Sequence, residues 1–71
     1  MKMIEVDSKN LKEIGYDPEK NILAVRFKYH DRLYHYEKVP EKVWLALKEA
    51  YSKGEFFESF IKPIYKGKKQ D

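Results

Sequence analysis

The chain has 71 residues, 42% of them hydrophobic and 15% aromatic, so it forms one domain at most and is too apolar to be disordered. It contains no cysteine, which excludes disulfides and thiolate metal sites. The formal net charge of +3 is mild for a nucleic-acid module, although the pI of about 9.1 fits one.

No apolar run in the sequence reaches the roughly 20 residues that span a bilayer. The first ten residues, MKMIEVDSKN, lack the apolar stretch of a signal peptide. We therefore expect an intracellular, cytoplasmic protein without a membrane partner.

Residues 10–17, NLKEIGYD, are predicted to form the first strand. The apolar residues Leu11, Ile14 and Tyr16 are not strictly two apart, which predicts a bend or bulge, at Gly15. The following DPEKN is typical of a type I turn, because aspartate and proline suit its first two positions.

Residues 22–29 give the clearest strand, with alternate large residues up to Phe27 and Tyr29 on one face. A two-residue turn, His30-Asp31, is predicted to join it to a third strand. That register places Phe27 opposite Tyr34 and Val25 opposite Tyr36. All the large residues of this hairpin then share one face, which the rest of the chain must cover.

Two short helices are predicted to provide the cover. Pro40 suits the first turn of a helix that Gly54 would end, and Ser52 with Glu55 forms a capping box for a second helix that Pro63 would stop. The predicted fold class is α+β: a three-stranded antiparallel meander with two short C-terminal helices packed on one face. The single domain spans residues 1–71, with a core at about 8–65 and a basic, flexible tail at 66–71.

The segments IGYD, YHY, VP and ALKEAYSKGEFF, in this order, resemble the KTSC domain. This small module occurs at the C-terminus of some lysyl-tRNA synthetases and as a free-standing bacterial protein. The resemblance covers residues 8–65, and Tyr34 and Tyr36 match the family's Tyr-x-Tyr mark. It implies an RNA-binding appendage, by association with a tRNA enzyme, with neither catalytic residues nor cofactors.

The chain departs from the family pattern at two places. His30-Asp31 stands where the family favours an Asn-Gly-like turn, and Glu58 stands where an asparagine is frequent. If that asparagine touches a ligand, the acidic replacement would disfavour an anionic one.

The tyrosines allow two interpretations. Aromatic residues on an open sheet face stack nucleic-acid bases. Because Tyr34 and Tyr36 share a face with Val25 and Phe27, we favour a structural role in the core.

Basic residues are the candidates for phosphate contacts. Some lie on the opposite face of the hairpin and others near the C-terminus, and the predicted nucleic-acid-binding set is Arg26, Lys28, His35, Lys62, Lys66, Lys68 and Lys69. The alternative for the hairpin residues is an ordinary solvated face, with Glu37 paired to Arg26 or His35.

Nothing in the sequence indicates an enzyme. There is neither a glycine-rich phosphate loop nor a nucleophile elbow, and His30, Asp31 and His35 are too far apart along the hairpin for a metal site. We therefore predict a non-catalytic binding module, without cofactor or small-molecule substrate, whose partner is RNA. The alternative is a protein-interaction module or homodimer without a nucleic-acid role, anchored by Trp44 or Phe56.

Overall fold

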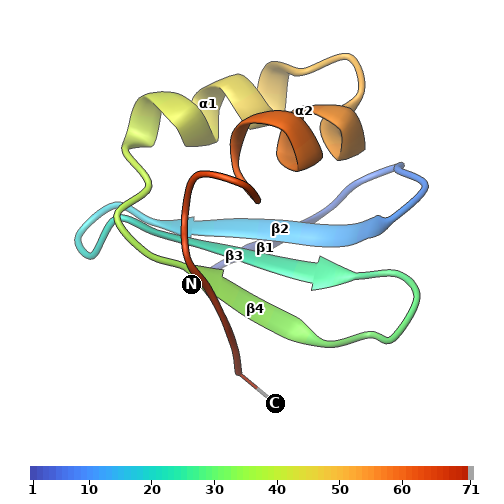
Figure 1. The fold of residues 1–71 in the computed structure, drawn as a ribbon, viewed down its shortest axis with the longest axis horizontal. Coiled ribbons are helices and arrows are strands. Elements are labelled where there is room, and N and C mark those ends of the chain that lie inside the picture. The colour runs from blue at the N-terminus through green and yellow to red at the C-terminus, as the bar shows by residue number, and fades with distance from the viewer. Residues whose placement is uncertain (71) are drawn as a thin grey trace.

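The computed structural model describes residues 1–70, which form an antiparallel sheet with two helices on one of its faces (Figure 1). The elements in chain order are β1 (Met3–Glu5), β2 (Leu11–Asp17), β3 (Ile22–Phe27), β4 (Leu33–Tyr36), α1 (Glu41–Glu49), α2 (Lys53–Phe60) and β5 (Gly67–Lys69). The sheet has five strands in the order β1-β2-β3-β4-β5, so the spatial order repeats the chain order.

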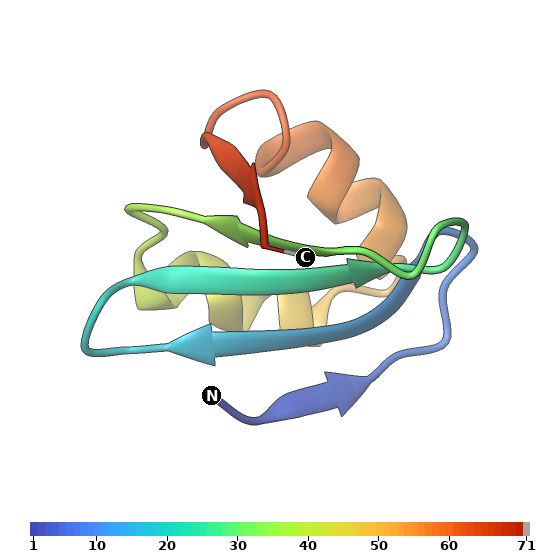
Figure 2. The same ribbon diagram turned by 90° about the horizontal axis from the view of Figure 1, so that it is seen from below.

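The α+β class and the two helices on an antiparallel sheet are confirmed, but the prediction of three strands is wrong. The missed strands, β1 and β5, lie at the two edges and are three residues long, too short to show an alternating pattern. Residues 67–69, expected in a flexible tail, pair with β4 as β5 (Figure 2). Asp71, the last residue of that tail, lies outside the described residues.

The irregularity expected in the first strand exists, but it lies between Leu11 and Glu13 instead of at Gly15. Gly15 serves the pairing of β1 with β2. A side chain there would place its Cβ 2.6 Å from the Sδ of Met3 and 2.8 Å from the backbone oxygen of Lys2. The glycine therefore lets β1 come close enough to complete this edge of the sheet.

The β3–β4 register is shifted by two residues from the predicted one, so that Tyr34 faces Val25 and Tyr36 faces Leu23. The strand β3 ends at Phe27, whose N–H donates to the Arg32 oxygen at 3.2 Å across a four-residue turn. A shift of two keeps every side chain on its face, so the hydrophobic pattern fits both registers equally well.

The turn between β3 and β4 is held by contacts that the hairpin pattern does not reveal. Asp31 has the left-handed φ of 57° that aspartate tolerates, and its carboxylate lies 2.9 Å from the Lys12 Nζ. The N–H of Lys28 donates to the Asn10 oxygen at 2.9 Å. As a result Tyr29 leaves the strand and is 79% exposed, contrary to the expectation that it continues the apolar face.

The second helix begins as predicted, because the Ser52 Oγ accepts a hydrogen bond from the Glu55 N–H at 3.4 Å. Gly54, however, does not end the first helix; it lies buried inside α2 with a negative φ. A side chain there would collide with Asn10 and Ser8. Gly54 therefore lets α2 approach the segment that precedes β2.

The helices and the covered face of the sheet enclose a core of aromatic and aliphatic side chains: Leu11, Ile14, Tyr16, Leu23, Val25, Tyr36, Val39, Trp44, Leu47, Phe57 and Ile61. Trp44 stacks on Tyr16 with ring centroids 5.6 Å apart and planes 11° apart. Because it is only 8% exposed, Trp44 is not available as an outward anchor for the protein-interaction alternative. Phe56 is half-buried against the core.

Candidate nucleic-acid interface

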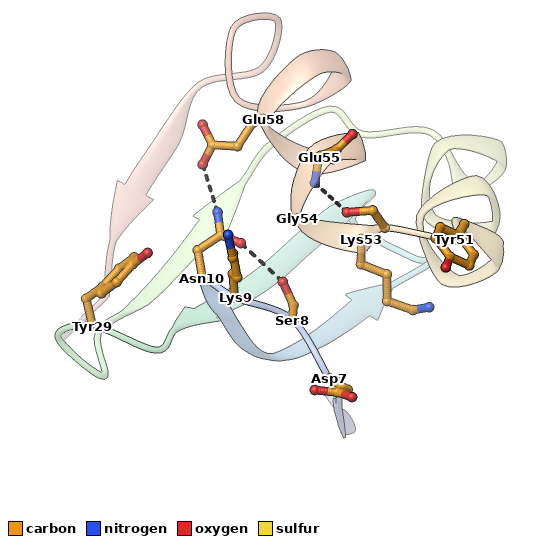
Figure 3. A pocket seen from close by; sticks show the side chains of 11 residues that line it. Asp7, Ser8, Lys9, Asn10, Tyr29, Tyr51, Lys53, Gly54, Glu55 and Glu58 are labelled. Carbon is orange, nitrogen blue, oxygen red and sulfur yellow. Dashed lines mark hydrogen bonds between the residues drawn. The ribbon is translucent and has the colours of Figure 1, made fainter.

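Two hollows lie beside α2. The larger, about 750 Å³, runs between residues 7–10 and residues 51–55, with Tyr29 across from them (Figure 3). Its charged side chains are mixed, with Asp7, Glu55 and Glu58 against Lys9 and Lys53. This groove therefore has no dominant charge with which to attract an anion.

The smaller hollow, about 250 Å³, is mainly aromatic. Its walls include Phe27, Tyr34 and His30: the Tyr34 ring stands edge-on to Phe27 with centroids 5.5 Å apart, and 6.2 Å from the imidazole of His30. Lys62 and Glu58 supply its charged groups. We call it the aromatic hollow.

A series of polar contacts links residues that line the two hollows. The Asn10 amide donates to the Glu58 Oε2 at 3.1 Å, and its own oxygen accepts from the Ser8 hydroxyl at 3.1 Å (Figure 3). The Lys62 Nζ lies 3.7 Å from the other Glu58 oxygen. Asn10, Tyr29 and Glu58 line both hollows, so the carboxylate at the position of the family departure borders each of them.

Tyr36 forms the inner wall of the aromatic hollow. Its ring packs edge-on against Phe57 with centroids 5.3 Å apart, and the residue is 5% exposed. Burial, followed by the neighbouring Tyr34 and Glu58, raises the pKa of Tyr36 from 10.0 to about 12, so the hydroxyl keeps its proton at neutral pH. Within residues 1–70 we find no hydrogen bond that this hydroxyl makes.

Two of the basic residues expected to contact phosphate are engaged with the chain itself. The Arg26 Nε lies 3.1 Å from the Glu13 carboxylate, and its guanidinium also donates to the Asp31 backbone oxygen at 2.8 Å. Lys28 belongs to the turn, not to the strand, and its Nζ donates to the Ser8 backbone oxygen at 2.7 Å. Their contacts bind the sheet and the turn together.

His35 lies on the uncovered face, as expected, in a row of facing residues that crosses all five strands (Figure 2): Met3, Gly15, Ala24, His35 and Lys68. Lys68 lies 3.2 Å from the Glu37 carboxylate. Glu37 therefore pairs with Lys68 of β5 instead of with Arg26 or His35. This partner could not be predicted because β5 itself was not.

Two of the remaining lysines, Lys62 and Lys69, lie near the aromatic hollow. Lys69 faces Tyr34 in the β4–β5 pairing, and facing residues of antiparallel strands share a side of the sheet. Lys62 lines the hollow directly. Lys66 and Lys69 form no ion pair with any described residue. The structure thus brings Lys62 and Lys69 to the same side of the sheet, whereas Arg26 and Lys28 are engaged by contacts within the chain.

Asn10 is a site residue that the sequence did not indicate, because its partner Glu58 lies 48 positions along the chain. Among residues 1–70 there is no group of three His, Cys, Asp or Glu side chains able to hold a metal ion. The same part of the chain contains no helix with the length and apolarity to cross a bilayer.

Comparison with known proteins identifies relatives along nearly the whole chain. The profile of the KTSC domain matches residues 7–65. An uncharacterized protein of Stutzerimonas stutzeri is 46% identical over 63 residues, which cover 89% of this chain and 87% of the relative. A protein of Tsukamurella paurometabola is 38% identical over 64 residues, covering 90% and 94%.

A solved structure gives the same result for the fold. The crystal structure of a KTSC domain protein from Yersinia pestis superimposes with a TM-score of 0.93 at 33% sequence identity, over 99% of this chain and 97% of that one. The match therefore extends beyond residues 7–65 to the edges of the sheet.

Proposed function

The chain is a member of the KTSC domain family, and we propose that it binds single-stranded RNA through lysines beside the aromatic hollow. The observation that carries this proposal is the pairing of β5 with β4, by which Lys69 comes to the side of the sheet where Lys62 and Tyr34 border the hollow. Proteins that bind single strands combine cations along the backbone path with aromatic rings that stack the bases.

The lysines are free to exchange partners. The pairs Lys62–Glu58 and Lys68–Glu37 lie at the surface, where the lysine side chains are 57% and 53% exposed. Exposed ion pairs of this kind contribute about 0–1 kcal/mol to stability. A phosphate group would therefore displace either carboxylate at small cost, and it would meet Lys66 and Lys69 without displacing a described partner.

The RNA would follow a different path from the one expected from the sequence. Arg26 and Lys28 are omitted because each is held by contacts within the chain. His35 and Lys68 face the uncovered side of the sheet and would be reached only at its edge. The backbone of the RNA would follow β5 and the end of α2.

The test is a salt titration of binding to a short oligouridine, followed by fluorescence anisotropy. Each phosphate neutralised on a single strand contributes about 0.7 to the slope of log affinity against log salt. Replacing Lys66 and Lys69 with glutamine should therefore lower the slope by about 1.4. The matched control removes the same charge elsewhere, at Lys2 and Lys20, and should leave the slope unchanged. Equal slopes for the two double variants, or no binding at about 50 mM salt, would contradict the proposal.

One observation favours the protein-interaction alternative. Phe60 and Ile64, at the end of α2 and in the following turn, are 57% and 65% exposed, and the Phe60 ring lies 5.1 Å from that of Phe56. Neighbouring exposed apolar side chains mark protein contacts. Sedimentation of the wild type and of Phe60→Ser tests this candidate. The wild type should form an associated species whose share rises with concentration, and the substitution should remove that species.

A further inference from the structure

The aromatic hollow has the size and lining of a site for one flat heteroaromatic ring. Its volume of about 250 Å³ is below the roughly 300–1,000 Å³ of pockets that enclose whole drug-sized ligands. Rings stand along its wall, with Phe27 and Tyr34 edge-on to each other and His30 tilted 47° from Tyr34. Such walls suit stacking, which every nucleobase accepts because each has a π-face.

The Tyr36 hydroxyl gives the hollow an unused hydrogen-bonding group. The residue is 5% exposed, it lines the hollow, and no described residue accepts its proton. Because no side-chain nitrogen or oxygen among the described residues is both buried and without a partner, this hydroxyl reaches the surface of the protein. An acceptor atom on a ligand in the hollow would give it a partner.

Glu58 determines which ring fits best. Its carboxylate has about four acceptor positions and no donor, and Asn10 and Lys62 each approach one of its oxygens. Acceptor positions therefore remain for a ligand that presents N–H donors. Among the RNA bases, guanine has two adjacent N–H donors on its Watson–Crick edge, the edge by which splayed-out bases are read.

We propose that the aromatic hollow seats one guanine of a bound RNA strand, with Glu58 accepting from its N–H edge, Tyr36 donating a hydrogen bond and Tyr34 stacking on the ring. This inference rests on the proposed RNA binding and gives it a division of labour. The lysines hold the backbone whatever the sequence, and the hollow selects the base.

The experiment compares a short oligouridine with the same oligomer carrying one central guanosine or one central adenosine. The guanosine oligomer should bind about tenfold tighter, within the range for one bidentate contact to a base edge. Glu58→Gln and Tyr36→Phe should each remove most of that preference and leave the salt slope unchanged. The matched control, Glu49→Gln, makes the same charge change on exposed α1 and should keep the tenfold ratio. Circular dichroism verifies that each variant is folded.

The failures of the two proposals are distinguishable. Equal binding of all three oligomers by the wild type, or a preference that survives Glu58→Gln and Tyr36→Phe, overturns the guanine site and leaves RNA binding intact. If no oligomer binds, RNA binding fails, and free guanosine is titrated while the Tyr34 and His30 ring signals are followed by NMR. Saturable shifts with guanosine but not uridine would retain the guanine site for a free nucleoside or nucleotide; their absence would overturn it.

Discussion

The two helices cover unlike parts of the core, and two buried tyrosines show the difference. In the part covered by α1, Tyr16 stacks on Trp44 and its hydroxyl donates to the Val39 backbone oxygen at 2.5 Å. In the part covered by α2, Tyr36 is equally buried, yet its hydroxyl has no hydrogen-bond partner among the described residues and borders a hollow. One hydroxyl thus stabilises the fold, and the other makes no hydrogen bond to a described residue.

The neighbours of the two tyrosine rings differ as well. Burial raises the pKa of Tyr16, with smaller contributions from Glu41 and Asp17. Tyr36 has Tyr34 and Glu58 as its neighbours, and both of these also line the aromatic hollow. The part covered by α1 is therefore packed core, and the part covered by α2 combines core packing with the aromatic hollow in which we propose that a base is bound.

The largest expected effect tests whether the part covered by α2 is also core. Phe57 is fully buried and holds the rings of Tyr36 and Phe27 at 5.3 and 5.6 Å. Phe57→Ala should lower the free energy of unfolding by about 3–5 kcal/mol, measured by urea denaturation. Phe60→Ala, the same change at an exposed site in the same helix, should cost within about 0.5 kcal/mol. Similar losses for the two variants would contradict this packing.

An intermediate effect should separate the two hydroxyls. Tyr16→Phe leaves the Val39 oxygen without its donor inside the core and should cost about 1–3 kcal/mol of unfolding free energy. Tyr36→Phe removes no hydrogen bond to a described residue and should change stability by less than about 0.5 kcal/mol. Thermal or urea denaturation of both variants measures the difference. A larger loss of stability for Tyr36→Phe than for Tyr16→Phe would show instead that the Tyr36 hydroxyl stabilises the fold.

The effect confined to the narrowest range of conditions is the pH dependence of Tyr36. Because its pKa rises from 10.0 to about 12, the folded chain retains this proton across a range in which the unfolded chain loses it. The contribution to stability is complete below pH 10 and disappears as the pH rises through 12. The Tyr36→Phe variant should therefore lose less stability over that window than the wild type. Tyrosinate absorbance of the two proteins, with one late-titrating group present only in the wild type, provides the measurement.

The sequence predicted the parts of the fold that large side chains determine. The alternation from Leu23 to Phe27 identified the central strand and its buried face, and Ser52 with Glu55 located the start of α2. The β3–β4 register was wrong by two residues because that shift leaves the faces unchanged. Gly54 was misplaced because a glycine after an apolar stripe resembles a helix end, and only the proximity of Asn10 reveals its packing role.

The candidate site could be predicted only in part. Tyr34, Tyr36 and Lys62 were identified from motif and charge, but the strand that brings Lys69 beside them carries lysines where a tail was expected. Asn10 and Glu58 lie far apart in the chain, and no local pattern joins them. Long-range proximity of polar groups leaves no periodic trace in a single sequence, and this is why the hollow itself was not foreseen.

The order of the sheet also has a kinetic meaning. The pairs β1–β2, β2–β3 and β3–β4 each join strands that a short loop connects, so they need little conformational search. The β4–β5 pair is different, because both helices lie between its strands. We therefore expect β5 to dock last, after the helices are in place, and to detach first. The strand that carries Lys69 can then open and close at the sheet edge while the rest of the molecule stays folded.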